Sequence, residues 1–296
     1  MKSFDPKKIS TQALHGLLLS AVAPRPIALA STINKKGQNN LAPFSFFNVF
    51  SANPPIMIFS PARRGTDSTT KHTYENAKEI EEVVINVVNY ELVQQMVLTS
   101  ANFPEDVSEF KKAGFTPIKS SIVKPMRVKE SPVQFECKIT KIIELGDGPA
   151  SGNLIFAEVV QIHVNENVLL ENGRIDNQKI DLVGRVGGNY YSRANGNSLF
   201  EITRPNDNNM GMDTIPNDIK TSSVLTGNDL AILANESALP NETDINEYKL
   251  LELSDIFMKY EGDAVSLENA LHLKAKSLIE DKNITEAWMA LLSFNN

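Results

Sequence analysis

The segment Ala42–Pro55 combines aromatic, hydroxyl and amide side chains with a double proline, and it follows the mostly apolar stretch Pro24–Thr32. This mixture suits neither a plain strand nor a plain helix. Aromatic rings beside small polar groups and free backbone amides are typical of a platform for a flat, polar, anionic ligand. At least two of its four phenylalanines are expected in the core. Ser45, Asn48 and Ser51 are harder to explain there, because buried polar groups need hydrogen-bond partners.

A local basic cluster lies in Pro61–Thr73, where Arg63, Arg64 and Lys71 are interleaved with five hydroxyl residues. The spacing predicts a short helix over 69–79, directly after this cluster. Cations and hydroxyls ahead of a helix start form a good phosphate site, because the first helical amides are unsatisfied donors. The alternative is a solvated loop in which a threonine caps the helix.

Composition excludes several function classes. The formal net charge of −7 gives no broad cationic surface for nucleic acid or anionic lipid, and we expect neither partner. No apolar run approaches the roughly 18 residues of a membrane span. The four histidines are scattered without zinc-site spacing, so no metal site is expected. Walker A and G-x-S-x-G motifs are absent, and Gly146–Gly152 has the wrong spacing for a dinucleotide fingerprint. The single cysteine, Cys137, is expected to point inward as a small hydrophobe.

The pattern along the chain predicts a β-rich domain over 1–205 and a linker with a helical C-terminal extension over 206–296. Short strands without βαβ alternation favour a barrel or sandwich, mainly β with a few helices. The apolar run Leu17–Ala23 is interpreted as the first core segment of a cytoplasmic protein rather than as an export signal. Strands are expected at 27–33, 55–60 (buried on both faces), 82–88, 132–144 and 153–164, the last two as a hairpin; helices are expected at 69–79, 90–100, 248–260, 265–279 and 285–294.

The segments Pro24–Thr32 and Ala42–Pro55 resemble the signature of the flavin reductase-like family, flavoproteins of the flavoredoxin type with an FMN-binding split β-barrel. Further motifs follow in the family's order over roughly residues 10–205: Lys71-His-Thr73 matches its Lys-x-Thr, and Val123–Val133, Ile162-His-Val164 and Val183–Arg193 match later segments. The Thr-rich phosphate loop and the extension after 205 depart from the short members of the family.

The resemblance implies roles for individual residues. Arg64, Lys71 and Thr73 would hold the FMN phosphate, with Arg63 as an alternative cation. The isoalloxazine edge would be lined by Ser45, Phe46, Phe47 and Asn48, with Ser51 near the ribityl phosphate, Thr32 at the pyrimidine side and Tyr190 or Tyr191 near the ring. Three residues have two alternative interpretations each. Asn86 could donate a hydrogen bond to the cofactor or to the backbone, and Lys124 could reach the flavin or point into solvent. His163 could contact the cofactor or nicotinamide, or it could be a structural histidine whose hydrogen bonds are satisfied within the protein.

By the same resemblance, the chain is an NAD(P)H-dependent flavin reductase that passes electrons through FMN to a small molecule or a redox protein. No acid–base triad is needed, because the isoalloxazine itself carries the chemistry. A homodimer with FMN at its interface is the natural expectation. Two alternatives stay open: an FMN-binding electron carrier without nicotinamide activity, and a split barrel that binds a partner without a cofactor. Sequence offers no NAD(P)H fingerprint that decides between the first two.

Overall fold

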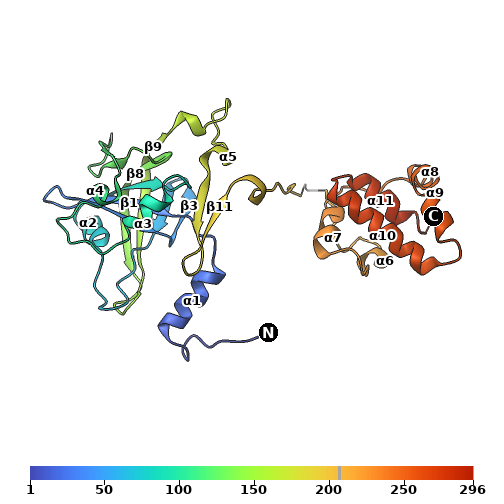
Figure 1. The fold of residues 1–296 in the computed structure, drawn as a ribbon, viewed down its shortest axis with the longest axis horizontal. Coiled ribbons are helices and arrows are strands. Elements are labelled where there is room, and N and C mark those ends of the chain that lie inside the picture. The colour runs from blue at the N-terminus through green and yellow to red at the C-terminus, as the bar shows by residue number, and fades with distance from the viewer. Residues whose placement is uncertain (206–207, 296) are drawn as a thin grey trace. The chain divides into compact units, whose positions relative to one another are not determined.

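The computed structural model describes residues 1–205 and 208–295, which divide into two compact units, Met1–Phe200 and Glu201–Asn296 (Figure 1). The sequence-based division after Pro205 lies just beyond this boundary. Residues 206 and 207, inside the predicted linker, lie outside the described residues. The two units are described separately below.

The N-terminal unit is built on one seven-stranded antiparallel sheet in the order β2-β1-β5-β8-β9-β4-β3. Its strands are β1 (Ala28–Ile33), β2 (Asn39–Phe44), β3 (Phe47–Ala52), β4 (Pro55–Phe59), β5 (Glu82–Val87), β8 (Val133–Glu144) and β9 (Asn153–Val164). Two short pairs complete the unit, β6 (Pro117–Ile118) with β7 (Arg127–Val128) and β10 (Leu182–Arg185) with β11 (Tyr191–Ala194).

Burial along the strands follows their place in the sheet. β1, in the interior of the order, is buried along nearly its whole length. The predicted β8–β9 hairpin is confirmed as an antiparallel pair with two register shifts, at Glu136/Cys137 and at Ile139/Lys141. The prediction that strand 55–60 is buried on both faces is wrong. Met57 and Phe59 are buried while Ile56 and Ile58 are half-buried, because β4 lies beside the edge strand β3. Cys137 is fully buried, as predicted, and burial raises the pKa of its thiol far above the ordinary value.

The two helices predicted in this unit, at 69–79 and 90–100, are shorter in the structure, and three further helices were not predicted. The helices of the unit are α1 (Thr11–Ala21), α2 (His72–Ile80), α3 (Val93–Leu98), α4 (Glu109–Ala113) and α5 (Asn177–Ile180), with 3₁₀ turns at Glu166–Val168 and Gly196–Ser198. Thr69 does not start α2, because its carbonyl accepts from the Arg64 amide and its own amide donates to Asp67.

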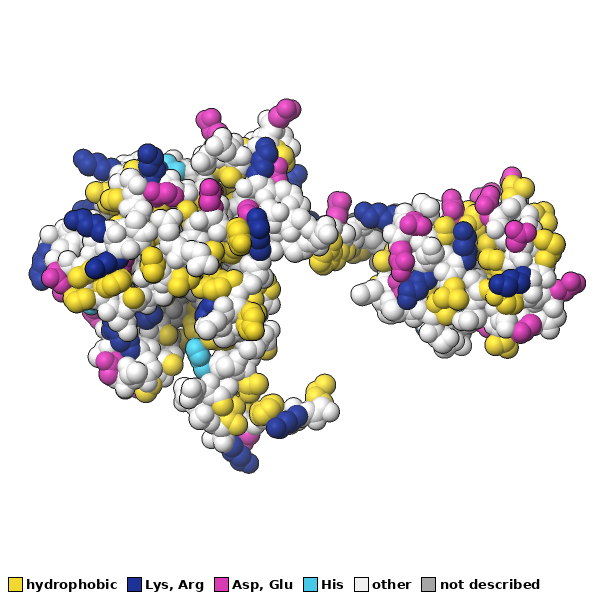
Figure 2. Space-filling model, in the orientation of Figure 1, with side chains coloured by type: hydrophobic (Ala, Val, Ile, Leu, Met, Phe, Trp, Pro, Cys, Tyr) yellow, Lys and Arg dark blue, Asp and Glu magenta, His cyan; other side chains and the backbone are white. Residues whose placement is uncertain are grey.

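Helix α1 corrects the interpretation of Leu17–Ala23 as a core segment. The helix buries no residue, and Leu17, Leu18 and Val22 are exposed. In the view of Figure 1 the helix projects from the sheet, and Figure 2 shows hydrophobic side chains at the surface there. Apolar residues alone could not reveal that this chain leaves them uncovered.

The C-terminal unit is helical and has its own core around Trp288, Leu233 and Leu253, all fully buried. Its helices are α6 (Asn217–Lys220), α7 (Gly227–Ala234), α8 (Glu242–Glu252), α9 (Ser254–Lys259), α10 (Ala264–Glu280) and α11 (Ile284–Leu292). The predicted helix 248–260 is divided at Leu253, and α8 begins earlier because Asn241 caps a polar first turn. Ile215 is buried in this core, so the described part of the predicted linker, from 208 on, packs with this unit.

The predicted fold class, mainly β with helices followed by a helical C-terminal extension, is confirmed. Among the described residues, none of the helices combines the length and the apolar character that a membrane span needs.

Candidate functional site

The predicted phosphate residues Arg64, Lys71 and Thr73 line one small cavity of about 60 Å³ at the start of α2. Lys71 is the N-cap residue of this helix and makes no side-chain capping hydrogen bond. The first turn of α2 is therefore not capped by this side chain, and Arg64 and Lys71 both line the cavity at the helix start. The remaining lining comes from β2, from the first residues of α2 and α4, and from the segment after α3, namely Asn40, Ala42, Pro43, His72, Thr99, Ser100, Ala101, Asn102, Phe103 and Glu109.

Arg64 and Lys71 form no ion pair with any described residue. The Arg64 guanidinium donates to Thr69 Oγ1 at 3.0 Å and to the Thr70 carbonyl, and these contacts fix its position. The Lys71 ammonium lies 5.3 Å from the centre of the Phe44 ring. Burial and the neighbouring charge of Arg64 lower the pKa of Lys71. Two cations that line one cavity without an ion-pair partner among the described residues form a site that an anion would stabilise.

Thr73 and Glu109 show how the cavity is built. Thr73 is buried, and its Oγ1 accepts from the Asn40 side chain at 2.9 Å, which joins α2 to β2. Burial raises the pKa of Glu109, although its carboxylate accepts from the Leu41 amide at 3.1 Å.

The aromatic segment after β2 lies at the edge of the sheet, because β3 is the last strand in the order. Of its phenylalanines, Phe44 is buried in the core and Phe47 packs against that core, which confirms that at least two are core residues. Phe46 and Phe50 are exposed. Among the polar residues, the Ser45 hydroxyl accepts a hydrogen bond from the Arg25 guanidinium at 3.4 Å. The side-chain oxygen of Asn48 accepts from the backbone amide of Val49. Ser51 is half-buried and lies beside a β-bulge.

Thr32 and Asn86 lie in the interior of the sheet. Thr32 is fully buried and its Oγ1 accepts from Asn76 of α2 at 3.2 Å. Asn86 donates to the Leu29 carbonyl at 3.0 Å and accepts from the Val128 amide at 2.9 Å. Of the two readings for Asn86, the contacts in this chain are those of the backbone alternative.

Lys124 and His163 lie apart from the lining of the phosphate cavity. The Lys124 side chain is exposed, and its backbone amide donates to Glu82 at 2.8 Å. His163 on β9 contacts the buried carboxylate of Glu136 at 2.7 Å. The structure therefore brings the predicted phosphate residues together in one cavity, and neither Lys124 nor His163 lines that cavity.

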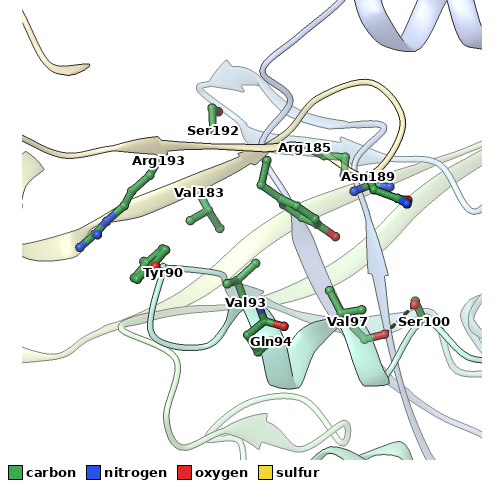
Figure 3. Close-up of a pocket in the computed structure, with 11 residues that line it drawn as sticks. Tyr90, Val93, Gln94, Val97, Ser100, Val183, Arg185, Asn189, Ser192 and Arg193 are labelled. Carbon is green, nitrogen blue, oxygen red and sulfur yellow. Dashed lines mark hydrogen bonds between the residues drawn. The ribbon is translucent and has the colours of Figure 1, made fainter. Parts of the chain in front are cut away.

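A second cavity, of about 520 Å³, lies between α3 and the β10–β11 hairpin. In Figure 3, Val183 points from the hairpin toward Val93 of α3, Arg193 reaches toward Tyr90, and the Arg185 side chain lies near Asn189 of the hairpin turn. Tyr191 lines this cavity, whereas Tyr190 at the hairpin turn is 77% exposed and does not. Buried Arg25 anchors the hairpin through a hydrogen bond to the Val186 carbonyl, and it also donates to the Leu19 and Val22 carbonyls at the end of α1.

Sequence reasoning missed Asn40, Glu109 and the Thr99–Phe103 segment at the phosphate cavity. These residues are far from Pro61–Thr73 in the sequence. The β1–β2 register and the packing of α4 on β2 bring them to the phosphate cavity. The hydroxyl pair Thr99-Ser100 was the available signal, since it ends a predicted helix.

Comparison with known proteins decides the family. Residues 20–179 match the family model named Flavin reductase like domain. The chain belongs to the flavin reductase-like family. A protein of Aquifex aeolicus is 40% identical over 199 residues, which is 67% of this chain and 99% of the relative. A Bacillus subtilis relative is 33% identical over 69% of this chain and 100% of its own length.

Solved structures support the family and the fold. Nitrilotriacetate monooxygenase component B from Bacillus cereus is 33% identical, with a TM-score of 0.64 over 68% of this chain and 98% of that one. The 2-nitrobenzoate 2-nitroreductase of Pseudomonas fluorescens is 28% identical, with a TM-score of 0.61 over 70% and 98%. A structure from Shewanella frigidimarina with a split barrel domain is 27% identical, with a TM-score of 0.58 over 69% and 100%. Each alignment spans nearly the whole length of the solved structure but only about two thirds of this chain, so about a third of this chain has no counterpart in it.

Proposed function

We propose that this flavin reductase-like chain is an FMN-dependent oxidoreductase that takes hydride from NAD(P)H and passes electrons to an acceptor. The observation that carries the proposal is the pair Arg64 and Lys71, which converges on the start of α2 without a carboxylate partner among the described residues. A monophosphate matches this compact site, because charge-assisted hydrogen bonds and helix amides both favour it.

The residues present fit FMN in two parts. Arg64, Lys71 and the first turn of α2 would hold the phosphate, with Thr73 and Asn40 fixing the wall behind it. The ring and ribityl chain would be held by residues of the segment at the sheet edge, namely Ser45, Phe46, Phe47, Asn48 and Ser51. Thr32, Lys124 and Tyr190 are proposed from the family resemblance alone. When bound, FMN accepts a hydride and releases electrons one or two at a time.

The protein's own part is to bind and orient the ring, and to favour its reduced, anionic form. Neutral and cationic donors near the ring would stabilise negative charge that develops there. Buried Arg25 donates a hydrogen bond to Ser45 of this segment at 3.4 Å and so brings a cation close to it. No side chain of this chain needs to act as an acid–base catalyst for that chemistry.

We also propose a homodimer. Edge strand β3 exposes Val49 and Phe50 at 62% and 63%, and α1 exposes Leu18 and Val22. An exposed apolar edge strand is a liability unless something pairs with it or covers it. A second copy would cover these residues and complete the surroundings of the ring. A cytoplasmic location is proposed from the sequence alone.

The test is an absorbance spectrum of the purified protein, followed by anaerobic addition of NADH and of NADPH. Flavin bands, chromatography of the released cofactor as FMN, and bleaching by a nicotinamide nucleotide are expected. Bands without bleaching would favour the second candidate, an FMN-binding electron carrier. Failure to bind FMN even after reconstitution would contradict both.

A further inference from the structure

The cavity between α3 and the β10–β11 hairpin combines aromatic rings with cations. The Arg193 guanidinium lies 3.8 Å from the centre of the Tyr90 ring, and that of Arg185 lies 4.6 Å from the centre of the Tyr191 ring. Its volume of about 520 Å³ is in the usual range of small-molecule sites. Guanidinium planes and tyrosine rings both stack on flat aromatic molecules.

The two arginines differ in their charge balance. Arg193 is neutralised by Asp181, to which it donates two hydrogen bonds of 2.7 Å each. Arg185 is half-buried, donates to the Gly188 carbonyl at 2.6 Å and forms no ion pair with any described residue. Burial and the charge of Arg185 together lower the pKa of the neighbouring Arg25, which also lacks a described ion pair. An anion beside Arg185 would relieve this repulsion.

This cavity is separate from the phosphate site. Ser100 is the one residue that lines both cavities, and none of Arg64, Lys71, Thr73 or the β3 segment lines the larger one. Gln94 and Asn189 add amide groups to its walls, so a ligand's polar edge would find hydrogen-bond partners there. The larger cavity thus adjoins the proposed phosphate site, and of the residues predicted for the cofactor only Tyr191, the alternative to Tyr190, lines it.

We propose that this cavity binds a planar aromatic molecule that carries a negative group, with Arg185 holding the negative group and the ring lying between α3 and the hairpin. The negative group is a carboxylate on the ring or the phosphate of a nicotinamide nucleotide. The molecule's role as the second substrate rests on the proposed function; its binding does not.

The test compares two matched pairs of probes on the full-length protein by titration calorimetry. Benzoate and benzamide share a ring and differ in charge; nicotinamide mononucleotide and nicotinamide riboside differ by the phosphate. Arg185→Gln is expected to raise the dissociation constant of the anionic member of one pair about tenfold to a hundredfold, and to leave its partner without the anionic group nearly unchanged. The pair that responds identifies the source of the anion. Arg174→Gln, an exposed arginine without a described ion pair, is the control.

A second variant, Tyr191→Leu, keeps the cation and removes a ring, and it should weaken both members of the responding pair. Equal effects of Arg185→Gln on both members, or no binding of either anion, would overturn the proposal. So would a loss of FMN affinity in Arg185→Gln, since the cavity would then belong to the cofactor site. Charge-dependent binding in a chain that takes up no FMN would uphold this site while contradicting the proposed function.

Discussion

The Nε2 atom of His163 lies 2.7 Å from Oε1 of Glu136, and the Glu136 side chain is fully buried. Glu136 also accepts from the backbone amides of Ser121, Ile122 and Val123 at 2.6–3.1 Å. Burial alone would raise the pKa of Glu136, but these hydrogen bonds outweigh it and lower the pKa. An ionised carboxylate only accepts, so His163 donates. We propose the structural alternative for His163: it helps to hold the 121–123 segment on the sheet.

Replacing Glu136 with Gln should therefore destabilise the N-terminal unit by about 1–3 kcal/mol, since buried donors lose their charged acceptor. A lowered pKa contributes stability above the unfolded value of about 4.3, and this is lost as pH falls toward the folded value. The wild type should thus lose stability in acid more steeply than Glu136→Gln does. Denaturant unfolding from pH 7 to pH 3 measures this, with exposed Glu171→Gln as control. Parallel curves for wild type and Glu136→Gln would contradict it.

Lys71→Ala should weaken FMN binding about tenfold to a hundredfold, because a charge-assisted hydrogen bond to phosphate contributes about 1.5–3 kcal/mol. The fold should survive, since the Lys71 side chain makes no capping hydrogen bond. Fluorescence titration of the apoprotein with FMN measures the effect, and Lys111→Ala, an exposed lysine at the end of α4, is the control. An unchanged titration would shift the phosphate to Arg63 or Arg64.

Val49→Asp and Phe50→Asp should each shift the proposed dimer to monomer, because each places a charge on the exposed apolar edge of β3. Sedimentation velocity at several concentrations measures the assembly. Leu145→Asp is a matched control, since Leu145 is 64% exposed and lies beyond the end of β8. If all three variants sediment like the wild type, β3 is not the interface.

The sequence predicted the parts of the fold that local pattern determines. Alternation defined β8 and β9 to within a residue, and the hydroxyl-rich loop before α2 located Arg64, Lys71 and Thr73 together. Contacts between segments distant in the sequence could not be predicted from local pattern, which is why Asn40 and Glu109 were missed. The role of Asn86 depended on a carbonyl and an amide from two other segments, Leu29 and Val128.

The exposure of helix α1 and the cavity between α3 and the β10–β11 hairpin were not predicted, for related reasons. An apolar run predicts burial, but whether this chain or another copy covers it is not encoded in the run. Arg185 and Arg193 lie within a motif noted only for its tyrosines, and their different charge balance follows from Asp181, which precedes β10.

The C-terminal unit should be an accessory to the flavin site rather than a part of it. It has its own core, and Trp288, the single tryptophan, is fully buried there with its indole donating to the Leu233 carbonyl at 3.1 Å. On the visible face of this unit, Figure 2 shows Asp and Glu side chains with hydrophobic ones between them. Tryptophan emission therefore reports on this unit alone, while flavin release reports on the other.

Leu233→Ala should lower the stability of the C-terminal unit by about 2–5 kcal/mol, because it leaves a cavity in a fully buried position. The midpoint of the Trp288 emission change should fall while the FMN dissociation constant stays the same. Ile85→Ala, fully buried on β5, is the reciprocal control: it should lower the temperature of flavin release and leave the Trp288 midpoint unchanged. A chain ending at Pro205 should likewise keep FMN. If that shorter chain stays folded by circular dichroism yet loses the flavin, the C-terminal unit contributes directly to the site.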